Sequence, residues 1–454
     1  MKDQRRVVTL ALLGLAVFTV SSCDLYVPQT ISLWADVHPQ GWVVFTGSRP
    51  PFPPPPKPQD LTNKILLFHP ALGMTITLLQ DPFEDFSWPR WSTDALYWIG
   101  NSRTVYRLPV SFDNIERWIY DPSALLQAKP LSLQAAERLW ADFKGSIRAL
   151  APSPDGRYLA FLRETEKRFT IAVIDLVQNP PQEIAELPTA WLPCIIWTPD
   201  SRAILFARQY PKRTITLPFV DGQKTYPLGT IMRYELATAE ETPLARDIVF
   251  FTSPPQDSYD ESVLGPGPIA LSSDGQILYY TNFVTLSPRT AQDLRVGLYK
   301  VELPHGMRQL LVELPTPGIV YEIVVSPSSQ RLAFTLVSYH IGIGFSLQSS
   351  LYLATGDSTR QLAYQTNGWL FPLWLDDSHL AYVQFQLEMK DEKPPLGVQP
   401  ALWVYSVETN ERSNYLPLLT TQMQLDALRQ AVHQLAERVQ KLEQALQELQ
   451  NKDK

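Results

Sequence analysis

The chain has little of the chemistry from which common active sites are built. Its 454 residues include only two Cys and six His. Two cysteines exclude the disulfide framework that stabilises many small secreted domains. The six His residues, at positions 38, 69, 305, 340, 379 and 433, show none of the spacings that are typical of zinc sites. We therefore predict no metal and no other cofactor.

Several catalytic and binding motifs are also missing. The sequence has no Gly-x-Ser-x-Gly nucleophile motif, no phosphate-binding glycine loop and no EF-hand calcium loop. The formal net charge is −7, whereas a nucleic-acid-binding chain needs a basic footprint. We predict no catalytic residue and no nucleic-acid partner, and we expect that the protein is not an enzyme.

A long hydrophobic run is lacking as well. The longest candidate, Val7–Val20, is shorter than the about 20 residues that a membrane-spanning helix needs. Basic residues precede it and small residues follow it, which is typical of a secretory signal peptide. Ser21-Ser22-Cys23 at its end resembles the bacterial lipobox, which implies removal of residues 1–22 and a diacylglycerol on Cys23. A plain transmembrane anchor is the alternative.

These features predict where the mature protein resides. Lipid on Cys23 would attach it to the cell membrane on the extracytoplasmic side, either periplasmic or on the outer surface, and residues 23–30 would form a linker. The other cysteine, Cys194, lies in an apolar stretch, so we interpret it as an inert thiol rather than a nucleophile.

What the sequence does contain is a repeated motif. In its fullest copy, 152–162, Pro154, Asp155 and Gly156 form a turn signal and an apolar run follows. Such an apolar run predicts a buried strand. Further copies lie at 198–206, 272–280 and 326–334, with shortened copies at 38–45, 91–98 and 375–382. We assign a structural turn role to the repeated aspartates Asp94, Asp155, Asp200, Asp274 and Asp377.

Each copy is part of a larger unit. An apolar run often precedes the turn, which predicts a β-hairpin, and a third and often a fourth strand-like run follow. Four antiparallel strands repeated seven times are the signature of a β-propeller. We therefore predict an all-β fold, a seven-bladed β-propeller over residues 31–418. Six blades remain the alternative if the worn first copy is only a closing segment.

The repeat resembles the TolB-type, WD-repeat-like propeller repeat, whose turn is written P-x-W-S-P-D-G. Blade two matches its spacing well, with Pro89, Trp91 and Ser92 in place. The resemblance covers roughly residues 31–418. It implies a propeller fold and leaves function open, since members include periplasmic protein-binding subunits, the propeller halves of serine peptidases and a few sugar-acting enzymes.

Three stretches depart from the repeat. Residues 132–143 carry a capping Ser132 and a helical apolar period, which predicts a short helix. The insertions 209–228, 239–267 and 386–400 read as Pro-rich polar loops. Loops carry binding residues more often than scaffolds do, so they are candidates for a ligand surface, or else decoration without a ligand.

The apolar period changes to 3.5 residues in the tail, 420–454. This predicts a C-terminal α-helical coiled-coil segment. The tail is expected to form a homo-oligomer (dimer or trimer) or to dock a partner, unless it packs on its own propeller. The predicted seam consists of Leu425, Leu428, Val432, Leu435, Val439, Leu442, Leu446 and Leu449.

Together these features predict a membrane-anchored lipoprotein whose propeller is a binding platform for a protein or a cell-envelope ligand. The alternative is a propeller hydrolase or lyase that acts on extracellular glycans or peptides. A third possibility is a structural subunit whose main contact is the coiled coil.

Replacement of the lipidated residue tests the anchor. Cys23→Ser should move the protein from the membrane pellet to the soluble fraction, because one thioether carries the diacylglycerol. Cys194→Ser is the matched control and should stay in the pellet. Membrane association of the Cys23→Ser variant would contradict the lipoprotein hypothesis.

Overall fold

The computed structural model describes most of the chain between residues 33 and 414. The seam leucines and valines of the tail, Cys23, Asp94 and Cys194 lie outside the described residues. The described residues are 33–37, 43–47, 64–69, 74–81, 84, 86–92, 95–109, 131–166, 168–189, 195–219, 222–249, 269–290, 293, 295–304, 306–314, 319–341, 345–356, 358–366, 368–374, 376–387 and 398–414.

The described strands form seven four-stranded antiparallel sheets, and each sheet uses four consecutive strands of the chain. The β-propeller that the repeat predicts is confirmed by this order. Even the worn first copy belongs to a complete sheet. In chain order, sheets 1 to 7 are β1(Leu33–Val37) β2(Val43–Gly47) β3(Lys64–His69) β4(Met74–Gln80); β5(Phe86–Trp91) β6(Ala95–Gly100) β7(Thr104–Pro109) β8(Glu137–Ala141); β9(Ser146–Pro152) β10(Tyr158–Glu164) β11(Phe169–Asp175) β12(Gln182–Thr189); β13(Ile195–Trp197) β14(Ala203–Phe219) β15(Gly222–Glu235) β16(Glu240–Val249); β17(Ala270–Leu271) β18(Ile277–Phe283) β19(Val296–Glu302) β20(Gln309–Glu313); β21(Ile319–Val325) β22(Arg331–Ile341) β23(Phe345–Thr355) β24(Ser358–Thr366); and β25(Gly368–Trp374) β26(His379–Leu387) β27(Val398–Ser406) β28(Arg412–Asn414).

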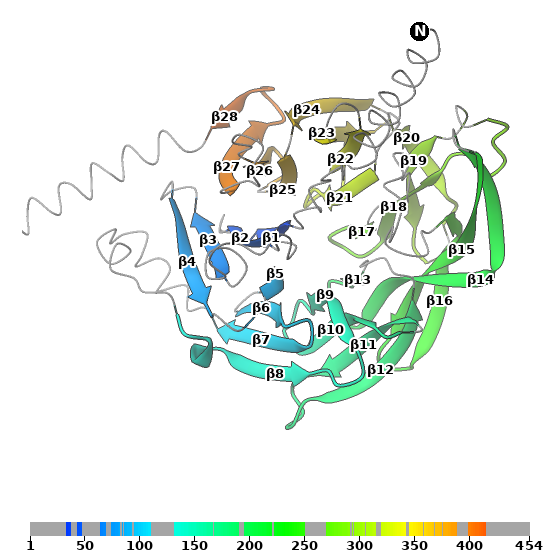
Figure 1. The fold of residues 1–454 in the computed structure, drawn as a ribbon. Coiled ribbons are helices and arrows are strands. Elements are labelled where there is room, and N and C mark those ends of the chain that lie inside the picture. The colour runs from blue at the N-terminus through cyan, green and yellow to red at the C-terminus, as the bar shows by residue number, and fades with distance from the viewer. Residues whose placement is uncertain are drawn as a thin grey trace, which may run out of the picture.

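The sheets are arranged around a common axis, with the first strand of each sheet innermost (Figure 1). Innermost strands of adjacent sheets contact one another, as β1 contacts β5 and β21 contacts β25. The core lies between the sheets, where both faces of the second strand are covered. The aromatic residues that end the repeat are accordingly buried; those described are Trp98, Phe161, Phe206, Tyr280, Phe334 and Tyr382.

A buried hydroxyl organises the repeat turn. Ser153 is 0% exposed; its Oγ donates to Asp155 Oδ1 (2.6 Å) and accepts from the backbone N of Tyr158 (2.8 Å). Asp155 also accepts from Arg157 N at 3.0 Å. The turn then needs a left-handed residue, which Gly156 supplies with φ +68°. The equivalent buried hydroxyls in the next copies are Thr198, Ser272 and Ser326.

Neighbouring repeat turns are bonded to each other. The backbone N of Asp155 donates to Ser201 Oγ (3.1 Å), which joins sheets 3 and 4. Ser273 Oγ donates to Pro327 O (2.6 Å), which joins sheets 5 and 6. A Cβ on Gly275 would lie 3.3 Å from Pro199, so the turns of sheets 4 and 5 also touch. The turns of sheets 3 to 6 thus form one continuous row.

The last repeat turn continues this row in a different way. Asp377 accepts from the backbone N of Ser328 (2.7 Å) in sheet 6 instead of from its own turn. Asp376 caps the turn of sheet 7 and accepts from Ser378 N (2.7 Å) and His379 N (2.8 Å). Asp200 and Asp274 bond within their own turns, as Asp155 does.

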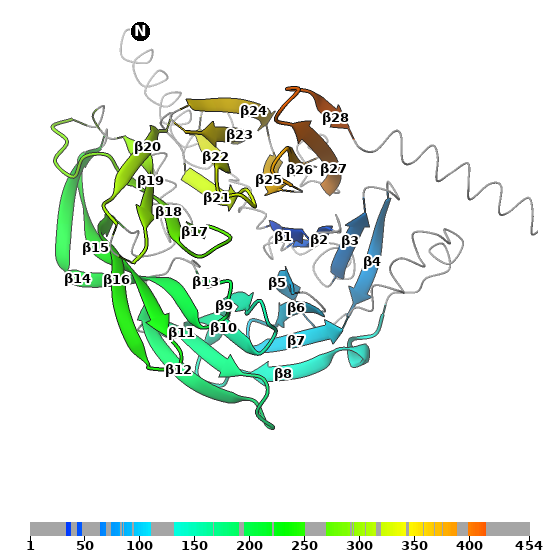
Figure 2. The same ribbon diagram turned by 180° about the vertical axis from the view of Figure 1, so that it is seen from behind.

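Antiparallel order gives the ring two unlike faces. Connections from first to second and from third to fourth strands lie on one face, which we name the turn face because it carries the repeat turns. Connections from second to third strands, and from one sheet to the next, lie on the opposite face, which we name the entry face. Figures 1 and 2 show the ring from its two sides.

The helix predicted over 132–143 is wrong. Ser132 does cap a turn, but the turn is only the 3₁₀ segment η1 (Leu133–Ala135), and β8 follows it. β8 pairs with β7 as the outermost strand of sheet 2. Pairing along the open edge of β7 therefore overrides the local helical period. Among the described residues, no helix is long and apolar enough to cross a membrane.

Much of the loop predicted at 209–228 is also strand. β14 and β15 extend beyond sheet 4 as a long hairpin. One side of this extension is apolar: Leu217 is fully buried against sheets 5 and 6, and Ile215 and Tyr226 pack beside it. The alternate residues Thr216 and Thr225 face solvent. The insertion thus braces the neighbouring sheets with one side and exposes the other.

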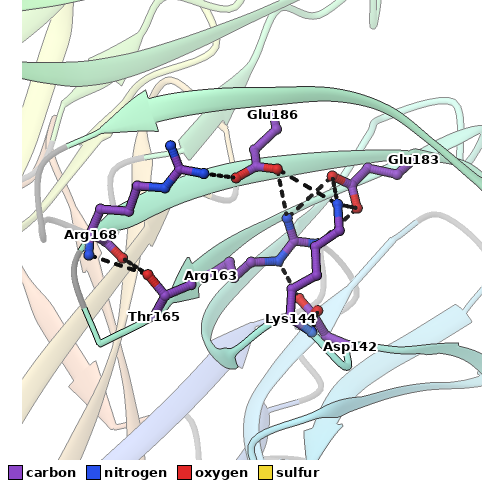
Figure 3. Close-up of polar contacts among 7 residues, drawn as sticks. All are labelled: Asp142, Lys144, Arg163, Thr165, Arg168, Glu183 and Glu186. Carbon is purple, nitrogen blue, oxygen red and sulfur yellow. Dashed lines mark hydrogen bonds and ion pairs between the residues drawn. The ribbon is translucent and has the colours of Figure 1, made fainter.

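A buried ion-pair cluster joins sheets 2 and 3 (Figure 3). Arg163 on β10 is 0% exposed, and its Nε donates to Asp142 Oδ2 at 2.5 Å. Asp142, 2% exposed, lies in the connection from β8 to β9. The guanidinium also reaches Glu183 (2.8 Å) and Glu186 (3.5 Å) on β12. The cluster fixes the crossing from one sheet to the next.

Loss of the Asp142 carboxylate tests this role. Asp142→Ala should lower the free energy of unfolding by about 3 kcal/mol, because it leaves a buried guanidinium short of a partner. The exposed Arg168, which pairs with Glu186, is the control, and Arg168→Ala should cost less than about 1 kcal/mol. Urea denaturation of both variants measures the difference, and equal costs would contradict a structural role for the buried pair.

Candidate functional site at the propeller axis

Three charged side chains from different sheets meet near the axis. Asp36 lies on β1, Arg90 on β5 and Glu322 on β21, all innermost strands. The charges of Asp36 and Arg90 both act on the Glu322 carboxyl. Each of the three residues is partly accessible to solvent. We name these three residues the axial cluster.

Local structure positions the first two members. Asp36 Oδ2 accepts from the backbone N of Trp91 at 2.7 Å, which ties β1 to β5. The register of β5 against β6 shifts between Ser87 and Arg90, and Trp88 within this bulge has φ +50°. A bulge turns side chains away from the regular alternation. Arg90 lies over the Trp88 ring, with its Cζ 5.2 Å from the ring centroid.

Glu322 is the titratable member of the cluster. Burial raises its pKa from 4.5 to about 7; the Arg90 charge opposes this rise and Asp36 adds to it. Protein surrounds the carboxyl, although part of its surface still reaches solvent. Near neutral pH the group therefore exists in both protonation states. It can attract a cation when ionised and can donate a hydrogen bond when protonated.

The repeat-based reading did not single out these residues, although the sequence carries a signal for two of them. Glu322 interrupts the apolar strand 319–325, and Asp36 similarly interrupts 33–37. An isolated charge in an inner strand costs free energy unless it is paired or functional. Arg90 carried no comparable signal, because it sits beside a recognised turn.

The structure does not bring the predicted turn aspartates into this cluster. Those described lie on the turn face and serve the turns. Hydrogen bonds from Thr198 and Ser272 hold the pKa of Asp200 and of Asp274, respectively, below its usual value. Among the described residues, no group of His, Cys, Asp and Glu could hold a metal ion.

Comparison with known proteins finds distant structural likeness. No protein-family model matches the chain. No curated protein matches it either. TolB from Acinetobacter baumannii is 12% identical with a TM-score of 0.38, over 72% of this chain and 61% of that one. The β-propeller domain of the Trilobed protease from Pyrococcus furiosus is 12% identical with a TM-score of 0.46, over 85% and 97%.

A third solved structure, an acylaminoacyl peptidase, is 13% identical with a TM-score of 0.48 and matches 84% of this chain. The chain spans only 52% of that peptidase. At such distances no activity carries over from these proteins. The fold assignment rests on the strand order of the chain itself.

Neutralising Glu322 tests the axial cluster. The folded-state pKa lies above the unfolded value, so the folded protein retains a proton that the unfolded chain loses. The free energy of unfolding should therefore fall as pH rises from 4.5 to 7 and level off above 7. At roughly 1.4 kcal/mol per pKa unit, the fall is at most about 3 kcal/mol.

Urea denaturation between pH 5 and 8 measures this slope. Glu322→Gln should flatten it, whereas Glu313→Gln, at an exposed ion pair on β20, should leave it unchanged. An unaltered slope in Glu322→Gln would show that the carboxyl titrates normally.

Proposed function

We propose that the protein is an exported lipoprotein, anchored through Cys23, whose seven sheets close into a seven-bladed propeller that serves as a binding platform. Its ligand is a protein or a component of the cell envelope. The tail, 420–454, self-associates or docks a partner as a coiled coil. The observation that supports binding is the axial cluster, in which charges from three sheets converge at one partly accessible place.

The surrounding scaffold suits such a platform. The bonded row of repeat turns and the Asp36–Trp91 bond connect the innermost strands through neighbouring sheets. Two tryptophans add to this, because Trp197 Nε1 donates to Ala151 O (2.9 Å) and Trp374 Nε1 to Val324 O (3.3 Å) of the preceding sheets. Charges held by rigid strands need little reordering when a ligand binds.

The charges also limit the ligand. Asp36 and ionised Glu322 favour a cationic group, such as an amine or a basic side chain. Arg90 favours a carbonyl or carboxylate nearby. A peptide segment or an amine-bearing envelope component offers both groups. Binding through a cation should tighten as pH rises through 7, because Glu322 then loses its proton.

An enzyme is the second candidate function. Glu322, with a pKa near 7 and a second carboxylate close by, has the property that general acid–base catalysis uses at neutral pH. Turnover of an extracellular glycan or peptide that is lost in Glu322→Gln would favour this alternative. Binding without turnover would favour the platform.

Site-directed photo-crosslinking in intact membranes tests the platform. A benzoyl-phenylalanine in place of Trp88 should capture a ligand at the axis, and the same group in place of Tyr364 on the outermost strand β24 is the control. Adducts from position 88 should weaken with Arg90→Ala and persist when residues 420–454 are deleted. Adducts lost only with the tail would make the coiled coil the binding part.

A further inference from the structure

The direction of the first strand determines where the membrane anchor is attached. β1 is an innermost strand and runs from the entry face to the turn between β1 and β2 on the turn face. The chain therefore joins the ring at the centre of the entry face. β28, an outermost strand, runs toward the same face. Both ends of the propeller point to one side.

The tether to the anchor is short. Only residues 24–32 separate Cys23 from β1. Fully extended at about 3.3–3.6 Å per residue, they reach roughly 30 Å. The distance from the membrane to the entry face is limited to this length.

The turn face lies farther away along the chain. A path from β1 around the ring must pass three further strands, about 14 Å at the usual strand spacing. It must then pass the depth of the ring, about 23 Å for strands of seven residues such as β10. The path of roughly 37 Å exceeds the reach of the tether. The turn face cannot lie on the membrane to which Cys23 is attached.

The entry face carries a side chain suited to a lipid surface. Phe143, in the connection from β8 to β9, is 89% exposed and is followed by Lys144. The connection is firmly held, because Asp142 N donates to Arg103 O (2.8 Å) and the Asp142 carboxylate bonds to Arg163. An exposed aromatic residue beside basic ones is typical of membrane interfaces.

The turn face has the opposite character. Its repeat turns place exposed carboxylates of Asp155, Asp200, Asp274, Asp376 and Asp377 along one row. Hydrogen bonds within and between the turns favour their charged form. Anionic lipids repel such a surface.

We propose that the entry face lies against the lipid surface, with Phe143 at the level of the headgroups, and that the turn face points away from the membrane. This orientation rests on the proposed lipidation of Cys23. It leaves the turn-face end of the axis, where Asp36 and Arg90 end their strands, open to partners in solution.

Lipid-attached quenching measures the orientation. The full lipidated chain, with Cys194→Ser, is placed in vesicles of phosphatidylethanolamine and phosphatidylglycerol that contain a headgroup nitroxide lipid. A fluorophore is attached at Phe143→Cys on the entry face. The matched controls are Met307→Cys in the connection from β19 to β20 on the turn face, 91% exposed, and Tyr364→Cys at the rim, 51% exposed. Quenching at 143 should exceed that at 307 and 364 several-fold.

Each other result overturns the proposal. Strongest quenching at 307 would mean the reverse orientation, and at 364 a ring that stands on its edge. Flotation with the vesicles without quenching at 143 would disprove the orientation while the anchor stands. Failure to float would disprove the lipid anchor and the orientation with it.

Discussion

The ring depends on a hydroxyl that is buried in the repeat turn. A buried Ser or Thr oxygen must find its partners inside the protein, and here they are the carboxylate two residues later and the backbone at the start of the next strand. That bond sets where the second strand begins, and hence which residues enter the core. It also presents the tip of the turn to the next sheet. The same side chain thus determines register within a sheet and contact between sheets.

The axial cluster benefits from this division of labour. Stability comes from the buried aromatic residues and the turn contacts, which leaves the inner strands able to carry charges that do not favour folding. Glu322 lies in an otherwise apolar strand and holds its proton near neutrality. A scaffold that tolerates such a group, without the complete pairing that Arg163 receives, is typical of a site retained for function.

Sequence reasoning succeeded where the information was local. The turn of 152–162 contains its own Ser, Asp and Gly, so its geometry could be read directly, and with it the strands and the propeller. It failed where pairing with distant strands decided the outcome. Residues 137–141 became a strand because β7 had an open edge, and 209–228 became a hairpin because sheets 5 and 6 offered an apolar surface. The axial cluster was missed because its members are distant in sequence, and no local pattern relates residue 36 to residue 322.

The consecutive strand order has a mechanical consequence. Among the described residues, sheet 1 contains only strands from the start of the propeller and sheet 7 only strands from its end. Both views place these two sheets side by side (Figures 1 and 2). No shared strand fastens them, so side-chain contacts alone close the circle there. A force between the membrane anchor and the tail would load this junction first, and the ring would part at the seam before any sheet lost a strand.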